Sequence, residues 1–266
     1  RGECAVAPSV ERILAHARPV LEKALALRRE ARFASFDALR AALEGVRFRD
    51  LRNGGTTYRI LQLVGKGGFG EVFKARSEGH TYAVKHLLKP EYAARFFREA
   101  KIMSALSDPC FVRFFDFLVL QHAGVKEAFL VMDFLPGMPG SSLRDAIRRS
   151  AGCGLDVESV LKAFVRYAHG LKTIHARGVY HRDVKPTNLY YPEDRPESAA
   201  IMDLGIARDE SGTETTGQVP GTLDYMPPET ALGGTRGDAG MDIYALGLCL
   251  YEALSGKKAF PRLPSG

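Results

Sequence analysis

Length, composition and charge exclude several classes of protein. The chain has 266 residues, of which 45% are hydrophobic and 26% charged, so it is long enough for one or two globular domains. This length excludes a peptide hormone, and the composition excludes a low-complexity sequence. The longest nearly uncharged apolar run, residues 243–251, is far shorter than the ~20 residues that a membrane-spanning helix needs. We therefore expect no membrane segment.

The net charge of +6 is distributed unevenly. Lys and Arg number 37 against 31 Asp and Glu, and residues 1–57 hold 11 and 7 of these, which leaves 26 and 24 for the remainder. No run of five like charges occurs, so a solvated surface is favoured over a patch for nucleic acid or anionic membrane. We expect no nucleic-acid partner.

The cysteines indicate the compartment. Cys4, Cys110, Cys153 and Cys249 are far apart, without a C-x-x-C pair or a nearby group of histidines. This pattern favours a reduced, cytoplasmic compartment and argues against a zinc site. The sequence begins with Arg1 and has no signal-peptide pattern, so we treat it as a piece of a longer protein.

Helical periodicity comes first along the chain. Residues 8–43 are rich in Ala, Leu, Arg and Glu with apolar residues at helical spacing, and Pro19 and Ser35 are suitable helix starts. Two or three helices are expected there. Residues 47–57, which contain Asn53-Gly54-Gly55, are typical of a linker or turn.

A change from strand patterns to helix patterns suggests two lobes. Strands are predicted over 58–64, 71–75, 81–87, 112–120 and 128–134, with one helix over 91–106. After Pro136-Gly137 the pattern predicts helices over 143–149, 157–177 and 241–255, with short strands near 188–191 and 200–202. A small sheet with one helix would thus join a mainly helical lobe near residues 133–140.

A glycine-rich stretch is the first candidate for ligand binding. Gly65, Gly67 and Gly70 form G-x-G-x-x-G, followed by a strand pattern over 71–75 rather than by a helix. A dinucleotide-binding motif would open a helix, so we expect a turn between strands, where missing Cβ atoms let backbone N–H groups approach phosphate oxygens. A glycine-rich turn without a ligand is the alternative when this motif is taken alone.

Polar residues near three further predicted strands could handle a phosphate and a metal ion. Lys85 lies among apolar neighbours on a strand, where its charged amine must find a partner or point outward. Asp183 and Asn188 occur within one stretch of eight residues, and Asp203 follows a short apolar strand. Two Asp and one Asn are oxygen ligands of the kind that Mg²⁺ prefers.

Taken in order, these residues resemble the protein kinase family, and specifically the eukaryotic-like (Hanks-type) bacterial Ser/Thr protein kinases. The glycine loop, the strand lysine, His181-Arg182-Asp183-Val184-Lys185-Pro186-Thr187-Asn188 and Asp203-Leu204-Gly205 occur in family order and spacing. The resemblance runs from about Tyr58 to Phe260. It implies an α+β, two-lobed fold with a small antiparallel sheet plus one helix in the N-lobe and a mainly helical C-lobe.

The resemblance implies that ATP binds between the lobes, with Mg²⁺ as the second cofactor. The adenine would lie against Val72 and Ala83, with its edge on the backbone from Asp133 to Leu135, and Met132 would be the gatekeeper. Tyr190 occupies the position under the base where the family usually has Leu. The implied nucleotide-binding set is Gly65, Gly67, Gly70, Val72, Ala83, Lys85, Met132, Asp133, Leu135 and Tyr190.

The resemblance also assigns chemical roles. The implied catalytic residues are Asp183, Lys185, Lys85 and Glu99, and the implied metal ligands are Asn188 and Asp203. Lys85, aligned by Glu99, would hold the α- and β-phosphates, while Asp183 would accept the proton of the substrate hydroxyl and Lys185 would steady the γ-phosphate. The implied function is ATP-dependent phosphorylation of Ser and Thr hydroxyls on proteins. A catalytically silent nucleotide-binding scaffold is the alternative.

Two departures and one loop bear on activity and partners. Leu204 replaces the usual Phe and is expected to pack beside Met103, Phe114 and His181. Arg182 precedes Asp183, which in the family is typical of activation by phosphorylation, so protein substrates and self-association for autophosphorylation are the expected partners. The candidate acceptors are Ser211, Thr213, Thr215 and Thr216.

The N-terminal helices resemble the last helices of a kinase C-lobe, which the chain lacks at its C-terminus. We expect residues 1–46 to be this helical segment, 47–57 a linker, 58–135 the N-lobe and 136–266 a C-lobe without its final helices. Circular permutation, the remnant of an upstream kinase domain and an unrelated helical extension all remain open. Permutation predicts that Arg32 pairs with Glu229 and that residues 10–44 pack on the helix beginning at Asp242.

Overall fold

The computed structural model describes residues 22–26, 28–44, 50–66, 70–87, 93–106, 108–122, 125–204, 223–231 and 238–260. The chain divides into two compact units, residues 1–63 with 73–81 and residues 64–72 with 82–266. Its helices are α2 (Phe36–Glu44), α3 (Ala93–Ala105), α4 (Leu143–Arg149), α5 (Val157–His175), α6 (Pro228–Ala231) and α7 (Ala239–Ser255). Its strands are β1 (Leu51–Asn53), β2 (Thr56–Lys66), β3 (Gly70–Ser77), β4 (His80–Leu87), β5 (Phe114–His122), β6 (Val125–Asp133), β7 (Leu189–Tyr190) and β8 (Ala200–Ile201).

The first unit contains helix α2 and a hairpin that the sequence analysis missed. The Ser35 hydroxyl accepts a hydrogen bond from the amide of Ala38 (3.1 Å), which fits its expected position at a helix start. Strand β1 pairs antiparallel with β2, Leu51 opposite Tyr58, within the region expected to be a linker or turn. Gly54, with φ of +54°, makes the tight turn between them. A strand of only three residues carries too little alternation to be recognised in the sequence.

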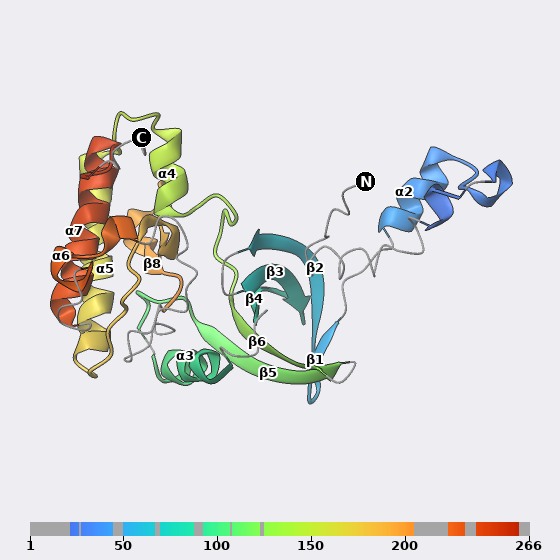
Figure 1. Ribbon diagram of the computed structural model, residues 1–266, viewed down its shortest axis with the longest axis horizontal. Helices are drawn as coiled ribbons and strands as arrows, with labels where there is room; N and C mark the ends of the chain where they lie inside the picture. Colours follow the sequence, from blue (N-terminus) through green and yellow to red (C-terminus); the bar gives the residue numbers. More distant parts are fainter. Residues whose placement is uncertain are drawn as a thin grey trace. The chain divides into compact units, whose positions relative to one another are not determined.

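In the second unit, three antiparallel strands and one helix enclose a small core. Strand β6 lies between β4 and β5, with Ala83 opposite Met132 and Phe117 opposite Leu130. Helix α3 packs on β5 (Figure 1). Among the described residues of this unit, β7 and β8 form a separate antiparallel pair, with Leu189 opposite Ile201.

The helical part of this unit is built around α5, which packs against α7 (Figure 1). Tyr167 and Ile174 of α5 are fully buried, and Cys249 of α7 lies in the same hydrophobic cluster. Helix starts are capped as their sequences favour: the Asp156 side chain accepts from the amide of Ser159, and Ser142 forms a reciprocal capping box with Asp145.

The fold class expected from the sequence is confirmed, because an antiparallel sheet with one helix and a mainly helical part follow one another in this order. The N-terminal expectations stay predictions. Arg32 donates from Nε to the carbonyl of Ala26 (2.8 Å), whereas Leu21 lies outside the described residues. No described helix is both long and apolar enough to cross a membrane.

Candidate active site

The loop from Tyr180 to Tyr191 is held by one buried carboxylate far along the chain. Asp242, at the start of α7, is fully buried and accepts hydrogen bonds from the backbone amides of His181 and Arg182, both at 2.8 Å. His175 Nε2 lies 2.8 Å from the same carboxylate. These bonds hold Arg182 at φ of +63°, a left-handed conformation that costs roughly 1–2 kcal/mol for a residue with a side chain. The resulting bend precedes Asp183 directly.

Asp183, Lys185 and Asn188 form one hydrogen-bonded group. Lys185 Nζ donates to Asp183 Oδ2 at 2.7 Å. Asn188 Nδ2 donates to the carbonyl oxygen of Asp183 at 2.9 Å and lies 3.3 Å from Oδ2. Pro186 opens the short 3-10 helix Pro186–Asn188, which turns the chain so that the Asn188 amide faces back toward Asp183. The structure thus brings together three of the residues singled out in the sequence.

Lys85 and Asp203 form a second charged pair, although they are 118 positions apart. Lys85 Nζ lies 2.7 Å from Asp203 Oδ1, and the side chains are 13% and 39% exposed. Lys85 is on β4, opposite Leu130 of β6, and Asp203 follows β8 closely. The amine on the strand therefore has the charged partner that its apolar neighbours require.

Four apolar residues of the implied nucleotide-binding set share one hydrophobic cluster. Ala83 and Met132 are buried in it, and Val72 and Leu135 pack against it. The backbone amide of Asp133, the residue after Met132, donates a hydrogen bond to the carbonyl of Arg113 (2.9 Å). Burial raises the pKa of the Asp133 carboxyl, against the opposing effect of the Arg113 charge.

Tyr190 is fixed at both ends. Its ring is buried, and its hydroxyl donates to the carbonyl of Pro136 at 3.1 Å, in the segment that follows β6. Its own carbonyl accepts from the hydroxyl of the fully buried Tyr167 at 2.7 Å. Burial raises the pKa of the Tyr190 phenol, so it stays a proton donor at neutral pH.

Comparison with known proteins decides the family. A family model described as "Protein kinase domain" matches residues 58–265. The chain belongs to the protein kinase domain family. The sequence also identified this family, from the residues now found paired.

The curated relatives are named as bacterial kinases. The chain is 35% identical over 216 residues to serine/threonine-protein kinase pkn2 of Myxococcus xanthus, covering 76% of this chain and 25% of that protein. It is 35% identical over 213 residues to serine/threonine-protein kinase PknA of Mycobacterium tuberculosis, covering 76% and 48%. A probable serine/threonine-protein kinase PknB of Bifidobacterium longum is 35% identical over 224 residues, covering 77% and 31%. The chain thus spans between a quarter and about half of their lengths.

Asp203 and Asn188 carry donor atoms of the kind that suits a magnesium ion also held by phosphate. The Asp203 carboxylate and the carboxamide oxygen of Asn188 are hard oxygen donors, and Mg²⁺ is commonly held by one or two such groups plus substrate phosphates. The described residues contain no group of three or more His, Cys, Asp or Glu that would form a cage of protein ligands alone. A kinase site completed by its nucleotide agrees with both observations.

The glycines of the glycine-rich stretch differ in whether the packing around them excludes a side chain. A Cβ on Gly70 would lie 2.3 Å from the carbonyl oxygen of His86, so close approach to β4 alone forbids a side chain. A Cβ on Gly65 would meet only Val72, at an ordinary 3.9 Å. Gly67 lies outside the described residues. For Gly70, the packing requirement is independent of any phosphate.

The structure describes Leu204 fully and Glu99 only in its backbone. Leu204 is buried in the same cluster as Met103, with Phe114 packed against it, as expected for a residue whose role is to fill space. Glu99 belongs to α3, but its side chain lies outside the description, so its pairing with Lys85 stays a prediction.

Sequence reasoning missed the polar contacts that fix the helical part of the kinase domain. Asp242 was recognised only as a helix opener. Arg144 of α4 donates to Glu252 of α7 at 2.6 Å and to the Tyr225 hydroxyl, which in turn donates to Glu252 at 2.5 Å. Only the polar identity of Glu252 inside an apolar helix pattern signals this group, and it does not name the partners.

Proposed function

We propose that this chain transfers the γ-phosphoryl group of ATP to Ser and Thr hydroxyls of proteins. The hydrogen-bonded group of Asp183, Lys185 and Asn188 is the observation that carries this proposal. Membership in the protein kinase domain family supports the reaction class. Names of the curated relatives support Ser and Thr as acceptors.

Asp183 is the proposed catalytic base. Its carboxylate accepts the proton of the substrate hydroxyl, and the bend at Arg182 together with the Asn188 bond to its carbonyl fixes its backbone. Lys185, whose amine is 2.7 Å from that carboxylate, would neutralise charge on the γ-phosphate. Most of the rate enhancement in phosphoryl transfer comes from such positioning and electrostatics.

Lys85, Asn188 and Asp203 are proposed to hold Mg-ATP. Lys85 would bind the α- and β-phosphates, and Asp203 with Asn188 would bind the metal. When bound, the nucleotide and Mg²⁺ supply the phosphoryl group and the positive charge that offsets the charge developing during transfer. Val72, Ala83, Met132 and Leu135, which share one hydrophobic cluster, would offer the base an apolar surface, and Tyr190 would take the family position under the base.

The remaining proposals concern activation and location. Ser211, Thr213, Thr215 and Thr216, which lie outside the described residues, are the proposed autophosphorylation sites, and self-association would bring them to a second copy's active site. Free thiols at Cys110, Cys153 and Cys249 support the proposal of a reducing, cytoplasmic compartment.

The test is phosphate transfer by the purified chain, supplied with Mg²⁺ and labelled ATP, to itself or to a generic basic protein. Asp183→Asn should lower transfer by about 1,000-fold or more while ATP affinity changes less than about twofold, because only the proton acceptor is lost. Asp203→Asn should also weaken Mg²⁺-dependent ATP binding.

A matched control separates kinase from scaffold. Asp194→Asn makes the same chemical change at a side chain that is 76% exposed, and it should leave transfer unchanged. Wild-type protein that binds Mg-ATP but transfers no phosphate would establish the silent scaffold instead. Normal turnover in Asp183→Asn would remove that residue from the mechanism.

A further inference from the structure

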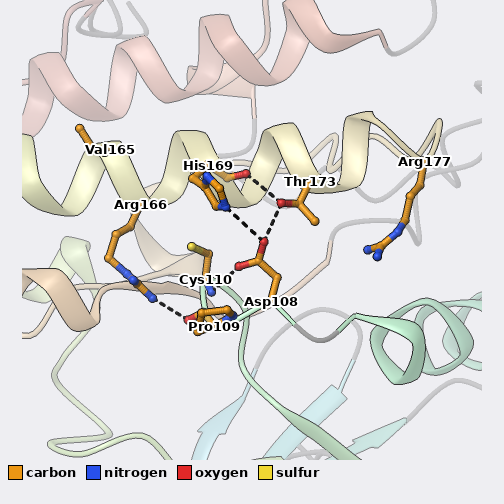
Figure 2. A pocket seen from close by; sticks show the side chains of 8 residues that line it. All are labelled: Asp108, Pro109, Cys110, Val165, Arg166, His169, Thr173 and Arg177. Atoms are coloured by element: carbon orange, nitrogen blue, oxygen red, sulfur yellow. Dashed lines mark hydrogen bonds and ion pairs between the residues drawn. The ribbon is translucent and has the colours of Figure 1, made fainter.

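A pocket of about 490 Å³ lies between α5 and the turn that leads into β5 (Figure 2). None of the residues assigned to phosphoryl transfer lines it. Its floor is formed around Asp108, and its wall by residues of one face of α5, namely Arg166, His169 and Thr173, with Arg177 just beyond the helix end. The volume is within the range of ligand-binding pockets.

The only carboxylate among the residues that line the pocket accepts two hydrogen bonds from within the protein. Asp108 accepts from the backbone amide of Cys110 at 2.8 Å and from the hydroxyl of Thr173 at 2.6 Å. His169 Nε2 lies 3.7 Å from it. Burial opposes ionisation of Asp108, but these hydrogen bonds outweigh it and lower the pKa of the carboxyl below its ordinary value. Asp108 therefore fixes the floor of the pocket.

The groups left for a ligand are cationic donors. Arg166, which lines the pocket, donates from Nε to the carbonyl of Ala199 (2.9 Å) and from Nη2 to that of Pro109 (2.7 Å), and these two bonds hold its guanidinium in place. Arg177 is exposed, and its guanidinium has no hydrogen-bonded or ionic partner among the residues that the structure describes. Since a guanidinium has no acceptor, a complementary ligand must offer anionic oxygens.

An apolar stripe continues from the pocket along α5. Val165, which lines the pocket, is 70% exposed, and Leu161 and Val157, four and eight positions before it, are 49% and 59% exposed. Residues four apart share one face of a helix. The surface thus combines a basic end with an apolar end.

We propose that this pocket is a docking site for an acidic peptide segment of a partner protein, whose carboxylates bind Arg166 and Arg177 and whose apolar side chains contact Val165 and Leu161. From Arg166 to the end of α5 at His175 the axis rises about 14 Å, which equals about four residues of extended peptide. Acidic residues about four positions apart would therefore span from Arg166 to the C-terminal end of α5, just before Arg177. This site is independent of the proposed phosphoryl transfer.

A peptide fits this surface better than a membrane or a nucleic acid. A flat bilayer surface does not enter a concave pocket, whereas a single chain does. Nucleic-acid affinity depends on many phosphate contacts, and the pocket offers only two arginines and one histidine beside an aspartate. Charge complementarity with a short acidic segment is the remaining match.

Fluorescence anisotropy of a labelled Glu-Leu-Glu-Glu-Leu-Glu peptide tests the site, in the absence of ATP and Mg²⁺. We expect saturable binding to the wild-type chain, weakened by added salt because exposed charges are screened. The matched Lys-Leu-Lys-Lys-Leu-Lys peptide should bind at least about tenfold more weakly. Vesicles of phosphatidylserine and phosphatidylcholine should not bind.

Arg177→Glu should weaken binding of the acidic peptide about tenfold, and Arg177→Lys should keep part of the affinity because it retains the charge without the planar fork. Arg148→Glu, at an exposed position on α4, is the control and should change affinity less than about twofold.

Several outcomes would overturn the proposal. They are the absence of binding at about 1 mM protein, equal weakening by Arg177→Glu and Arg148→Glu, equal binding of both peptides, and vesicle binding without peptide binding. Each leaves the kinase assay unaffected, because that assay uses different residues and requires nucleotide.

Discussion

The loop of residues 180–191, which carries Asp183, is held by a residue far along the chain, whereas the hydrogen bonds described within residues 22–44 are local. Asp242 lies 60 positions from the Arg182 amide that it binds. In the N-terminal stretch, Arg32 reaches Ala26, six positions away, and Ala38 reaches Ser35. The same kinds of polar group thus act at very different ranges.

Burial differs in the same way. Asp242 and His181 are fully buried, while the Phe36 ring is 91% exposed and Leu25 is 76% exposed. Local signals are sufficient to start and continue a helix, because capping and periodicity act within a few residues. Only contacts between distant residues hold a loop in a strained conformation, so the loop should be far more sensitive to substitution.

The largest expected effect is at the carboxylate of α7 that anchors the loop of residues 180–191. Asp242→Ala should lower the free energy of unfolding by about 3–5 kcal/mol, because it leaves the buried His181 amide, the partly buried Arg182 amide and His175 without their acceptor. Urea unfolding measures this loss, with the exposed Asp194→Ala as control. A loss under about 1 kcal/mol would show that the loop holds its own geometry.

A smaller effect is expected where α5 supports the same loop. Tyr167→Phe removes only the hydroxyl that donates to the Tyr190 carbonyl at 2.7 Å and should lower the free energy of unfolding by about 1–2 kcal/mol. Tyr251→Phe, at a ring that is 51% exposed, should change it by less than about 0.5 kcal/mol. Equal effects in urea unfolding would remove the distinction between these sites.

The buried thiol of Cys110, which lines the pocket beside α5, should resist alkylation at mildly alkaline pH. Burial, then the nearby Asp108, raises the pKa of Cys110 from 9.0 to about 11. Iodoacetamide at pH 8 should therefore label the exposed Cys153 and spare Cys110, as peptide mass spectrometry would report.

The sign of the stability effect follows from the same shift. A pKa raised on folding means that the folded state retains the proton, so the contribution of Cys110 is complete below pH 9 and is lost as the pH rises through about 11. Cys110→Ser should flatten the thermal stability profile over that interval. Rapid alkylation of Cys110 in the folded protein would contradict the assignment.

The smallest expected effect is in the N-terminal stretch. Phe36→Ser should change the free energy of unfolding by less than about 0.5 kcal/mol, because the ring is 91% exposed. Thermal unfolding with Leu39→Ser as a partly buried comparison would measure it. A loss above about 2 kcal/mol at Phe36 would instead support the docking of residues 10–44 that permutation predicts.

Short-range patterns allowed most of the fold to be predicted. The helix expected over 143–149 has those bounds, and that expected over 157–177 ends two residues earlier, at His175. Strand β1 was missed because its pairing with β2 depends on a turn rather than on its own pattern. Hydrophobic periodicity predicts a helix of several turns, but it does not predict a strand of three residues.

In the candidate site too, residues that are close in sequence could be predicted together, whereas residues that meet only in the fold could not. Asp183, Lys185 and Asn188 are close in sequence, so a motif of eight residues was enough to group them. Asp242, Arg144 and Glu252 bind partners far away in the sequence, which the spacing of residues does not predict. The residues of the α5 pocket also come from two segments that are distant in the sequence. Such groups become recognisable only once helices have packed.

The dependence of Arg182 on Asp242 has a consequence for synthesis on the ribosome. The amide of Arg182 leaves the ribosome 60 residues ahead of the carboxylate that binds it. At about 5–20 residues per second, that interval is roughly 3–12 s. During it the nascent chain carries Asp183 without the support that shapes its loop, so a half-made enzyme should be unable to phosphorylate its surroundings. The loop around Asp183 would take its final shape only after α7 has been synthesised.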